Sequence, residues 1–290
     1  MLELKAIVWD VQHGNATYMR TPNDKHIVID LGVGSYNFAK SSTSVFSPLL
    51  HLRDKYNAKV LDAVIITHPH TDHIDDILNF DKVSPRVLLR PKHLSETDIR
   101  KGNQQSAKAI IDRYLEISER YSNSVSSNDD PLQAGNNGGV QIQHFHPTAS
   151  STSNLNNHSI VTVVSYAGSK MIIPGDNEPP SWNELLERKG FLDAIKGTDI
   201  LVAPHHGRDS GYSPELFKYI KPYLTIISDG RFCETSATDR YGQQTHGLTV
   251  YKRSGGTEPR KCVTTRDNGV IDIEFGKNSN GSRYIKVTID

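Results

Sequence analysis

The sequence predicts an α/β protein in which two mixed β-sheets pack face to face and helices cover both outer faces. Short apolar segments bounded by Gly, Pro, Asn and Asp recur along the chain, first as several strands and then as two blocks that mix strands with helices. No Pro-rich or charged linker separates these blocks. We therefore expect one domain over residues 1–290.

The strands of the first half are predicted from apolar, β-branched segments that end at turn residues. The turn Thr21-Pro22-Asn23-Asp24 separates the second strand from the third. A long amphipathic helix is predicted between residues 96 and 121, because apolar residues there follow helical spacing. A loop rich in Ser, Asn, Asp and Gly follows at 122–139. The predicted strands cover residues 6–10, 16–19, 26–30, 61–66 and 87–89.

The second half predicts a hairpin, two helices and further strands. The hairpin joins residues 160–166 and 171–173 across a turn that contains Gly168. Ser181-Trp182-Asn183-Glu184 matches a capping box, so a helix should begin there and end at Gly190. Ser213-Pro214 should begin another helix, which reaches about residue 221. Other strands are expected at 140–146, 200–203, 224–228, 261–264, 270–275 and 284–289.

Charge and hydropathy restrict the classes of function. The chain has 33 basic and 33 acidic residues, which argues against a protein that holds nucleic acid mainly through a strong general field. A local basic stretch from Arg86 to Lys108 is either a guide for phosphates or a solvated face. The N-terminus resembles a strand and not a signal peptide, and no apolar stretch approaches the roughly 20 residues that span a bilayer. We expect a cytoplasmic protein without a membrane partner.

The densest group of reactive side chains is the run His68-Pro69-His70-Thr71-Asp72-His73, directly after the predicted strand 61–66. Binding sites of α/β folds lie at the carboxyl ends of strands. Imidazole and carboxylate are ligands for zinc, manganese or iron. A polar loop that happens to contain histidines is the alternative interpretation. The strand before the run and the helical pattern after it favour a metal site.

Two further candidate ligands also follow apolar strands. Asp176 comes after the strand 171–173, and His205 comes after the strand 200–203 in the run His205-His206-Gly207. A single Gly-Asp pair is a weak signal, and the His-His-Gly run is moderately specific. Their order in the chain, after the first motif, is what makes the set convincing.

The pattern His-x-His-x-Asp-His, then Gly-Asp, then His resembles the metallo-β-lactamase-fold hydrolases. The resemblance implies a four-layer αββα sandwich with two divalent ions, zinc or manganese. It also implies that Asp72 orients the attacking hydroxide, and it leaves His206 as a catalytic or substrate-contacting group outside the metal ligands, or as a surface histidine. The implied ligands are His68 and His70 for one ion, Asp72, His73 and His205 for the other, and Asp176 as the bridge.

The third ligand of the first ion stays open. The family usually supplies a histidine from the loop before the strand that leads to the bridging Asp. His158 is the only histidine in that stretch, and it lies a few residues later than is usual. Asn156 is the other candidate, through a narrower resemblance.

That narrower resemblance is to the hydrolase domain of the competence protein ComEC, and it extends from about Trp9 to Phe275. It implies that Asp30 holds the His68–His70 loop, a role compatible with a strand-end cap. It also suggests Asn156, Ser210 and His246 as substrate contacts. The matching segments are 10–16, 29–32, 156–159, 204–208 and 241–246, with departures at His13, Asn15, Arg208 and Gln243-Gln244.

The resemblance implies a metal-dependent phosphodiesterase or nuclease whose substrate is a nucleic acid or nucleotide. Hydrolysis of a small ester, thioester or lactam is the first alternative, because one fold hosts many substrates. A non-catalytic metal-binding protein of the same fold is the second alternative. The sequence identifies no protein partner.

Overall fold

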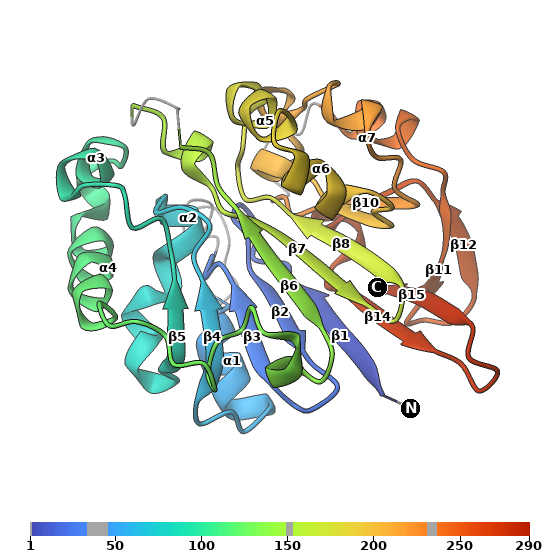
Figure 1. Cartoon of the computed structure of the whole chain (residues 1–290), viewed down its shortest axis with the longest axis horizontal. Helices are drawn as coiled ribbons and strands as arrows, with labels where there is room; N and C mark the ends of the chain where they lie inside the picture. The colour runs from blue at the N-terminus through green and yellow to red at the C-terminus, as the bar shows by residue number, and fades with distance from the viewer. Residues whose placement is uncertain (1, 34–45, 149–152, 231–236) are drawn as a thin grey trace.

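The computed structural model describes residues 2–33, 46–148, 153–230 and 237–290, and two β-sheets lie face to face at its centre (Figure 1). In this described part of the chain, the first sheet has nine strands and the second has six. The first sheet runs in the spatial order β12 (Thr257–Arg260), β11 (Leu248–Lys252), β15 (Arg283–Ile289), β14 (Ile271–Lys277), β1 (Glu3–Val8), β2 (Thr17–Arg20), β3 (His26–Ile29), β4 (Leu61–Ile65) and β5 (Pro85–Leu89). The second runs β13 (Cys262–Thr264), β10 (Leu224–Ile227), β9 (Ile200–Val202), β8 (Ser169–Ile173), β7 (Val161–Tyr166) and β6 (Gln141–Phe145).

Both sheets are mixed, as the sequence predicts. Strands β3, β4 and β5 are parallel to one another, whereas β1 pairs antiparallel with β2 and β14. In the second sheet β8, β9, β10 and β13 are parallel, and β6 and β7 are antiparallel additions.

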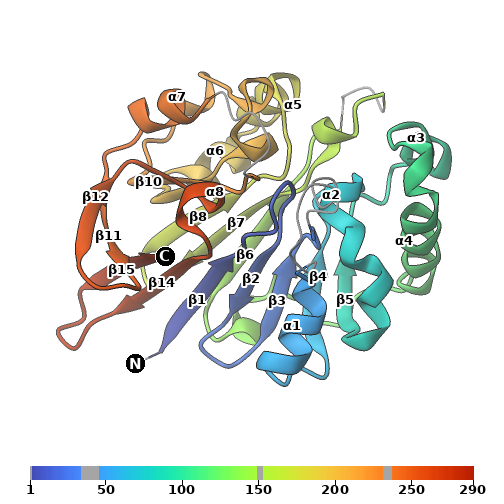
Figure 2. The same ribbon diagram turned by 180° about the vertical axis from the view of Figure 1, so that it is seen from behind.

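Helices cover the outer face of each sheet (Figures 1 and 2). On the first sheet lie α1 (Pro48–Lys55) and α4 (Lys108–Arg120), and on the second lie α5 (Pro179–Leu186) and α6 (Lys189–Ile195). Short helices complete the described chain: α2 (Thr71–Ile74), α3 (Glu96–Lys101), α7 (Thr238–Gln243) and α8 (Thr265–Asn268). None of the described helices combines the length and the apolar composition that a bilayer crossing requires.

Three apolar cores hold the layers together. Alternation along β4 shows how one strand serves two of them, because neighbouring residues point to opposite faces. Ile65 packs between the sheets with residues such as Ile173, whereas Val64 packs under the helices with Tyr114. A third core lies beneath α5 and α6 and contains the buried Trp182. These layers confirm the predicted αββα architecture.

Parallel strands bring the candidate ligands to one edge. Strands that run in the same direction end at the same side of a sheet. Asp30 follows β3, the run from His68 to His73 follows β4, and Asp176 follows β8. The turn after β9 carries His205 and His206. The two sheets therefore present all these side chains along their shared upper edge in Figure 1.

The predicted long helix between residues 96 and 121 is wrong, because the segment forms two helices. The capping box of Ser95 and Asp98 begins α3, which ends at Gly102. The side-chain amide of Asn103 then donates to the carbonyl oxygens of Ile99 and Pro69, both at 2.9 Å. These bonds tie the break between α3 and α4 to the turn that carries the histidine motif.

Two other helix predictions also need correction. Helix α5 begins after Glu178, with Pro179 and Pro180 in its first turn, and the Ser181 hydroxyl donates to Asn157. Gly190 lies inside α6 and does not end α5. The helix predicted after Ser213 is only a 3-10 turn, Leu216–Lys218. The sequence analysis did not predict α1, α6, α7, α8, β11 or β12.

Candidate metal centre

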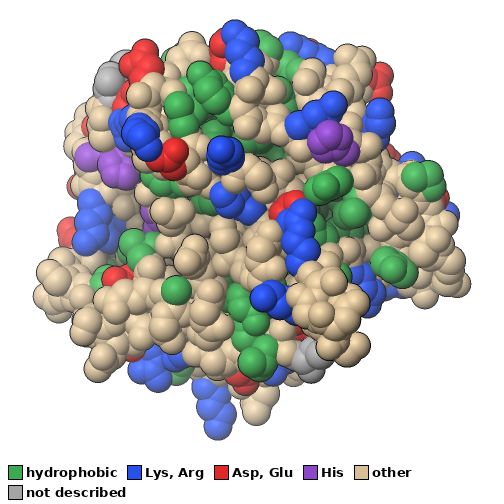
Figure 3. Space-filling model, turned by 45° about the vertical axis from the view of Figure 1, so that its right-hand side comes forward, with side chains coloured by type: hydrophobic (Ala, Val, Ile, Leu, Met, Phe, Trp, Pro, Cys, Tyr) green, Lys and Arg blue, Asp and Glu red, His purple; other side chains and the backbone are tan. Residues whose placement is uncertain are grey.

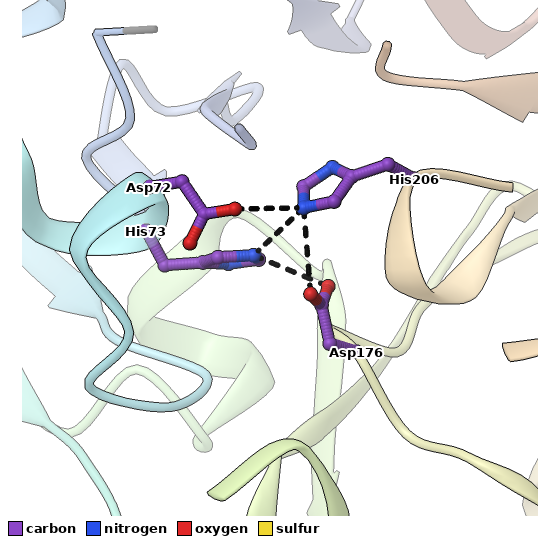
Figure 4. A group of neighbouring side chains, drawn as sticks. All are labelled: Asp72, His73, Asp176 and His206. Atoms are coloured by element: carbon purple, nitrogen blue, oxygen red, sulfur yellow. Dashed lines mark hydrogen bonds and ion pairs between the residues drawn. The ribbon is translucent and has the colours of Figure 1, made fainter. Parts of the chain in front are cut away.

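Four side chains converge at the shared edge of the sheets (Figure 4). One ligand atom from each of Asp72, His73, Asp176 and His206 lies within 4.8 Å of the other three. His206 Nε2 is 3.2 Å from Asp72 Oδ2, 3.3 Å from His73 Nε2 and 3.4 Å from Asp176 Oδ2. We call this group the four-residue cluster.

The two remaining histidines of the motif lie beside this cluster. His68 Nε2 is 3.0 Å from His70 Nδ1 and 3.9 Å from Asp176 Oδ2. The second oxygen of the same carboxylate, Oδ1, lies 3.1 Å from His73 Nε2. Asp176 therefore lies between the His68–His70 pair and the other three residues of the four-residue cluster, which is the position that a bridging ligand needs.

The Asp30 carboxylate holds the histidine motif in place. It accepts hydrogen bonds from the Thr67 backbone N–H at 2.7 Å, the Thr67 hydroxyl at 2.9 Å and the Asn15 amide at 3.0 Å. His73 Nδ1 also lies 2.7 Å from Asp30 Oδ2. With Nδ1 donating to this carboxylate, Nε2 of His73 is left as the ligand atom, a pairing that orients and strengthens histidine ligands.

Asp30→Asn is expected to weaken metal binding by about 10- to 100-fold, because it removes the negative charge that orients His73 while it keeps the side-chain shape. Titration of the metal-free variant with zinc or manganese measures this effect. The matched surface control is Asp193→Asn, whose carboxylate is exposed and pairs with Lys189. Equal metal affinities for the Asp30 variant and the wild type would contradict the orienting role.

The assignment of the two consecutive histidines is reversed relative to the sequence prediction. His206, and not His205, points into the four-residue cluster, whereas the sequence analysis assigned His205 to the second ion. Both residues adopt the left-handed conformation, with φ of 50° and 54°, and Gly207 follows at 73°. This backbone turns the second imidazole inward, where His206 Nδ1 also lies 3.1 Å from the Ser228 carbonyl oxygen.

His205 joins a separate polar network. Its Nδ1 lies 2.8 Å from the Ser210 hydroxyl and 3.3 Å from Glu178 Oε1. The Asn156 amide donates to Glu178 Oε1 at 3.2 Å, and the Asn154 amide donates to Oε2 at 2.8 Å. The hydrogen bond from His205, opposed by burial and supported by Asn156, lowers the pKa of Glu178. The sequence analysis predicted Asn156 and Ser210 as site residues but not Glu178. Glu178 contacts Asn156 directly and Ser210 through His205.

Two other predicted residues occupy different surroundings. His158 Nδ1 lies 2.9 Å from Nε2 of His93, a residue that the sequence analysis did not single out. The His246 ring contacts Tyr223, and its backbone N–H donates to the Pro222 carbonyl oxygen. Pro222 precedes β10, whereas Ser228 beside the cluster follows it. The structure thus separates His246 from the substrate site that the sequence analysis assigned to it.

Two residues beside the cluster come from distant segments. His13 Nε2 lies 3.2 Å from Asp72 Oδ2, and its ring is 4.6 Å from the His206 ring, centroid to centroid. Arg208 Nη2 lies 3.4 Å from His13 Nε2. The sequence analysis singled out His13 and Arg208 only because both depart from the competence-protein pattern.

A cavity of about 460 Å³ opens beside the cluster. Within the four-residue cluster, the Asp72 side chain is 21% exposed, whereas the other three are at most 4% exposed. Asp72 is therefore the cluster member that faces the cavity. The cavity is lined by His13, His70, Thr71, Asp72, Gly102, Asn103, Gln104, Ser106, Ala107, Ile110 and Arg208.

Three of the six basic side chains between Arg86 and Lys108 make contacts within the protein. Arg100 pairs with Glu96 and Asp112, both at 2.7 Å, and Lys108 pairs with Asp112 at 2.5 Å. Arg90 donates to the backbone carbonyl oxygens of Ser118 and Tyr121. These contacts favour the interpretation as a solvated, structural face.

The donor set fits divalent cations. It consists of nitrogen and carboxylate oxygen atoms, which zinc and manganese accept. Burial disfavours the charged form of His206, but Asp176 and Asp72 outweigh it and raise the pKa of His206 to about 10. In the same way, Asp176 and Asp30 outweigh burial and raise the pKa of His73 well above its usual value. Protonated His73 and His206 therefore balance the negative charge of Asp72 and Asp176, as a bound cation would.

The affinity of the four-residue cluster for a cation should rise with pH between 7 and 10. His73 and His206 must lose protons to become ligands, whereas burial lowers the pKa of His68 and His70, so that pair is already neutral. Calorimetry in buffers of different ionisation enthalpy should detect proton release mainly for one of two bound ions. Proton-independent binding of both ions would contradict this assignment.

The same shift has a consequence for the stability of the metal-free protein. The raised pKa of His206 stabilises the folded state. This contribution is complete at pH values below 6.5, the ordinary pKa of histidine, and it is lost as the pH rises toward about 10. Melting temperatures measured with a chelator should therefore fall between pH 7 and 10, and saturating metal should reduce the fall.

The chain is similar to a protein family and to several solved structures. A family model described as the metallo-beta-lactamase superfamily matches residues 9–222. No curated protein matches the chain. Similar solved structures include a new diphosphatase from the PhnP family, with 10% identity, a TM-score of 0.46 and coverage of 94% of this chain and 98% of that chain.

Two further similar structures are the short form of human tRNase Z and unliganded yeast PDE1. The human protein has 14% identity, a TM-score of 0.38 and coverage of 78% of this chain and 93% of its own. The yeast protein has 11% identity, a TM-score of 0.44 and coverage of 82% of this chain and 91% of its own. No substrate carries over to this chain at these values.

Proposed function

Because the chain belongs to the metallo-beta-lactamase superfamily, we propose that it is a metal-dependent hydrolase that cleaves phosphodiester bonds in a nucleic acid or nucleotide. The observation that carries the proposal is the cavity beside the cluster, which has a mainly polar lining and one arginine, Arg208. A phosphodiester is anionic, and such a lining suits it. The resemblance of segments 10–16, 156–159 and 204–208 to the competence protein, in spite of its departures at His13 and Arg208, implies the same substrate class.

The proposed ligands divide between two divalent ions, zinc or manganese. When bound, two such ions lower the pKa of a shared water and neutralise charge on phosphoryl oxygens. The ligands proposed for this purpose are His68 and His70 on one side, Asp72, His73 and His206 on the other, and Asp176 between them.

Asp72 has a second role in the proposal. It is the cluster carboxylate that faces the cavity, and His13 and His206 hold its Oδ2 at 3.2 Å each. Those contacts, together with the charge on His73, outweigh burial and lower the pKa of Asp72 well below its usual value. The carboxylate is therefore ionised at neutral pH, and it can orient an attacking water by accepting its hydrogen bond.

The polar lining argues against a small acyl substrate. Pockets for small apolar substrates are lined mainly by hydrophobic and aromatic side chains. Here Ala107 and Ile110 are the apolar side chains of the described lining, and neither is aromatic. On the face drawn in Figure 3, Lys and Arg side chains are dispersed among acidic and neutral side chains.

The decisive experiment is an activity panel with zinc- or manganese-loaded protein. The substrates are single-stranded DNA, duplex DNA, RNA, cyclic dinucleotides and a chromogenic lactam. We expect phosphodiester cleavage that a chelator abolishes and that Asp72→Asn reduces strongly. Rapid lactam hydrolysis without phosphodiester cleavage would replace this proposal with the alternative, a hydrolase of small acyl substrates.

A further inference from the structure

We propose that the cavity holds one nucleotide unit of the substrate and that Arg208 binds the phosphate of that unit. This inference rests on the proposed phosphodiesterase function and adds a specificity-determining residue to it. Arg208 is half-buried, lines the cavity and lies beside the cavity-facing residue Asp72 through their common neighbour His13. Its side chain thus lies where a substrate anion must approach the metal ligands.

The guanidinium of Arg208 has hydrogen-bonding capacity left for a ligand. Within the described ranges of the chain, no carboxylate lies within 4.0 Å of the guanidinium, and its Nη2 lies 3.4 Å from His13 Nε2. That nitrogen also lies 3.2 Å from Asp72 Oδ2. One ring nitrogen cannot donate a proton to Asp72 and accept one from Arg208 at the same time. A phosphate offers the planar guanidinium two acceptor oxygens, which it binds in a bidentate manner.

Arg240, on the nearby helix α7, provides the contrast. Its Nη1 pairs with Asp209 at 2.8 Å, and its guanidinium lies 3.8 Å from the centre of the Tyr212 ring. Arg240 therefore has a carboxylate partner, whereas Arg208 has none in the described structure. Since both arginines come from the same region of the fold, the difference in partners points to a ligand at Arg208.

Another part of the cavity lining suits a sugar and base. It is formed at the break between α3 and α4, where Gln104 and Ser106 offer polar groups and Ala107 and Ile110 offer apolar surface. The amide of Asn103 already donates to Pro69 and Ile99. Gln104 is therefore the amide available for recognition, and a Gln amide can donate and accept hydrogen bonds along the edge of a base.

The size of the cavity limits its occupant. Its volume of about 460 Å³ lies in the range of small-molecule sites, roughly 300–1,000 Å³. A single nucleotide fits this class of site, whereas a stacked duplex does not. We therefore infer that the substrate enters as an unpaired nucleotide, either at the end of a single strand or as a small phosphodiester.

Direct binding tests this inference without relying on catalysis. The probes are adenosine 5′-monophosphate and inorganic phosphate, titrated calorimetrically into metal-free and metal-loaded protein. Arg208→Gln should weaken binding of both probes at least about tenfold, since a charged hydrogen bond is lost. Arg208→Lys should restore part of the affinity, because it keeps the charge without the planar fork. Gln104→Ala should weaken the nucleotide about threefold or more but leave inorganic phosphate unchanged.

Arg240→Gln is the matched control, and it should leave both affinities unchanged. Circular dichroism of each variant excludes unfolding, and Arg208→Lys keeps the test valid if the Gln variant does not fold. Phosphodiester cleavage by the wild type combined with nucleotide binding that is insensitive to Arg208 would reject this inference and leave the proposed function standing. Arg208-dependent nucleotide binding without any phosphodiester cleavage would reject the proposed function and leave the nucleotide site.

Discussion

Asp176→Ala should reduce hydrolysis by about 10³-fold or more, the largest catalytic effect that we expect from a single substitution. Asp176 approaches His68, His73 and His206, so its loss removes a proposed ligand from both ions at once. The variant should also be less stable without metal by about 3–5 kcal/mol, because the two buried cationic histidines lose their shared counter-charge.

Elemental analysis and thermal unfolding of the purified variant measure both effects. Asp193→Ala is the control for removal of a carboxylate, since Asp193 is exposed and its partner is the surface residue Lys189. We expect the control to keep wild-type metal content and activity. Two bound ions in the Asp176 variant would disprove the bridging position.

His206→Ala should lose one of the two ions, and His205→Ala should keep both. His206 Nε2 meets three cluster residues within 3.4 Å, so its removal should reduce activity by about 10²-fold or more. His205 instead contacts Ser210 and Glu178. Because the two residues are adjacent and share the same chemistry, each variant serves as the control for the other.

Metal content after dialysis against a weak chelator distinguishes the two assignments. Loss of an ion from His205→Ala, with both ions kept by His206→Ala, would restore the assignment expected from the sequence. The difference in metal content between the two variants is more informative than either metal content alone, since both variants replace a histidine of the same tight turn.

The sequence predicted the parts of the site that depend on short segments. The run from His68 to His73 places four candidate ligands directly after one strand, so their spacing in the sequence was enough to single it out. Asp176 could be found because it follows a strongly apolar strand. The layers of the fold were predictable for the same reason, since most of their strands are short apolar runs between turn residues.

The parts that failed depend on contacts across the fold or on backbone conformation. His13 and Arg208 are 195 residues apart, and only the packed structure brings them together. The choice between His205 and His206 depends on two φ angles that residue type does not specify. The predicted helix was too long because the Asn103 side chain donates to the Pro69 carbonyl oxygen in the motif turn, a contact that helical periodicity in the sequence does not reveal.

The left-handed run His205-His206-Gly207 also bears on how this protein balances folding against activity. A left-handed conformation costs roughly 1–2 kcal/mol at a residue with a side chain, and glycine avoids that cost. Folding alone would therefore favour glycine at the first two positions, yet the chain carries histidine at both. At residue 206 the gain would be offset, because glycine would remove a proposed metal ligand and also the charge of His206 that stabilises the metal-free fold. Residue 205 is the position where such a gain can be sought without removing a proposed metal ligand.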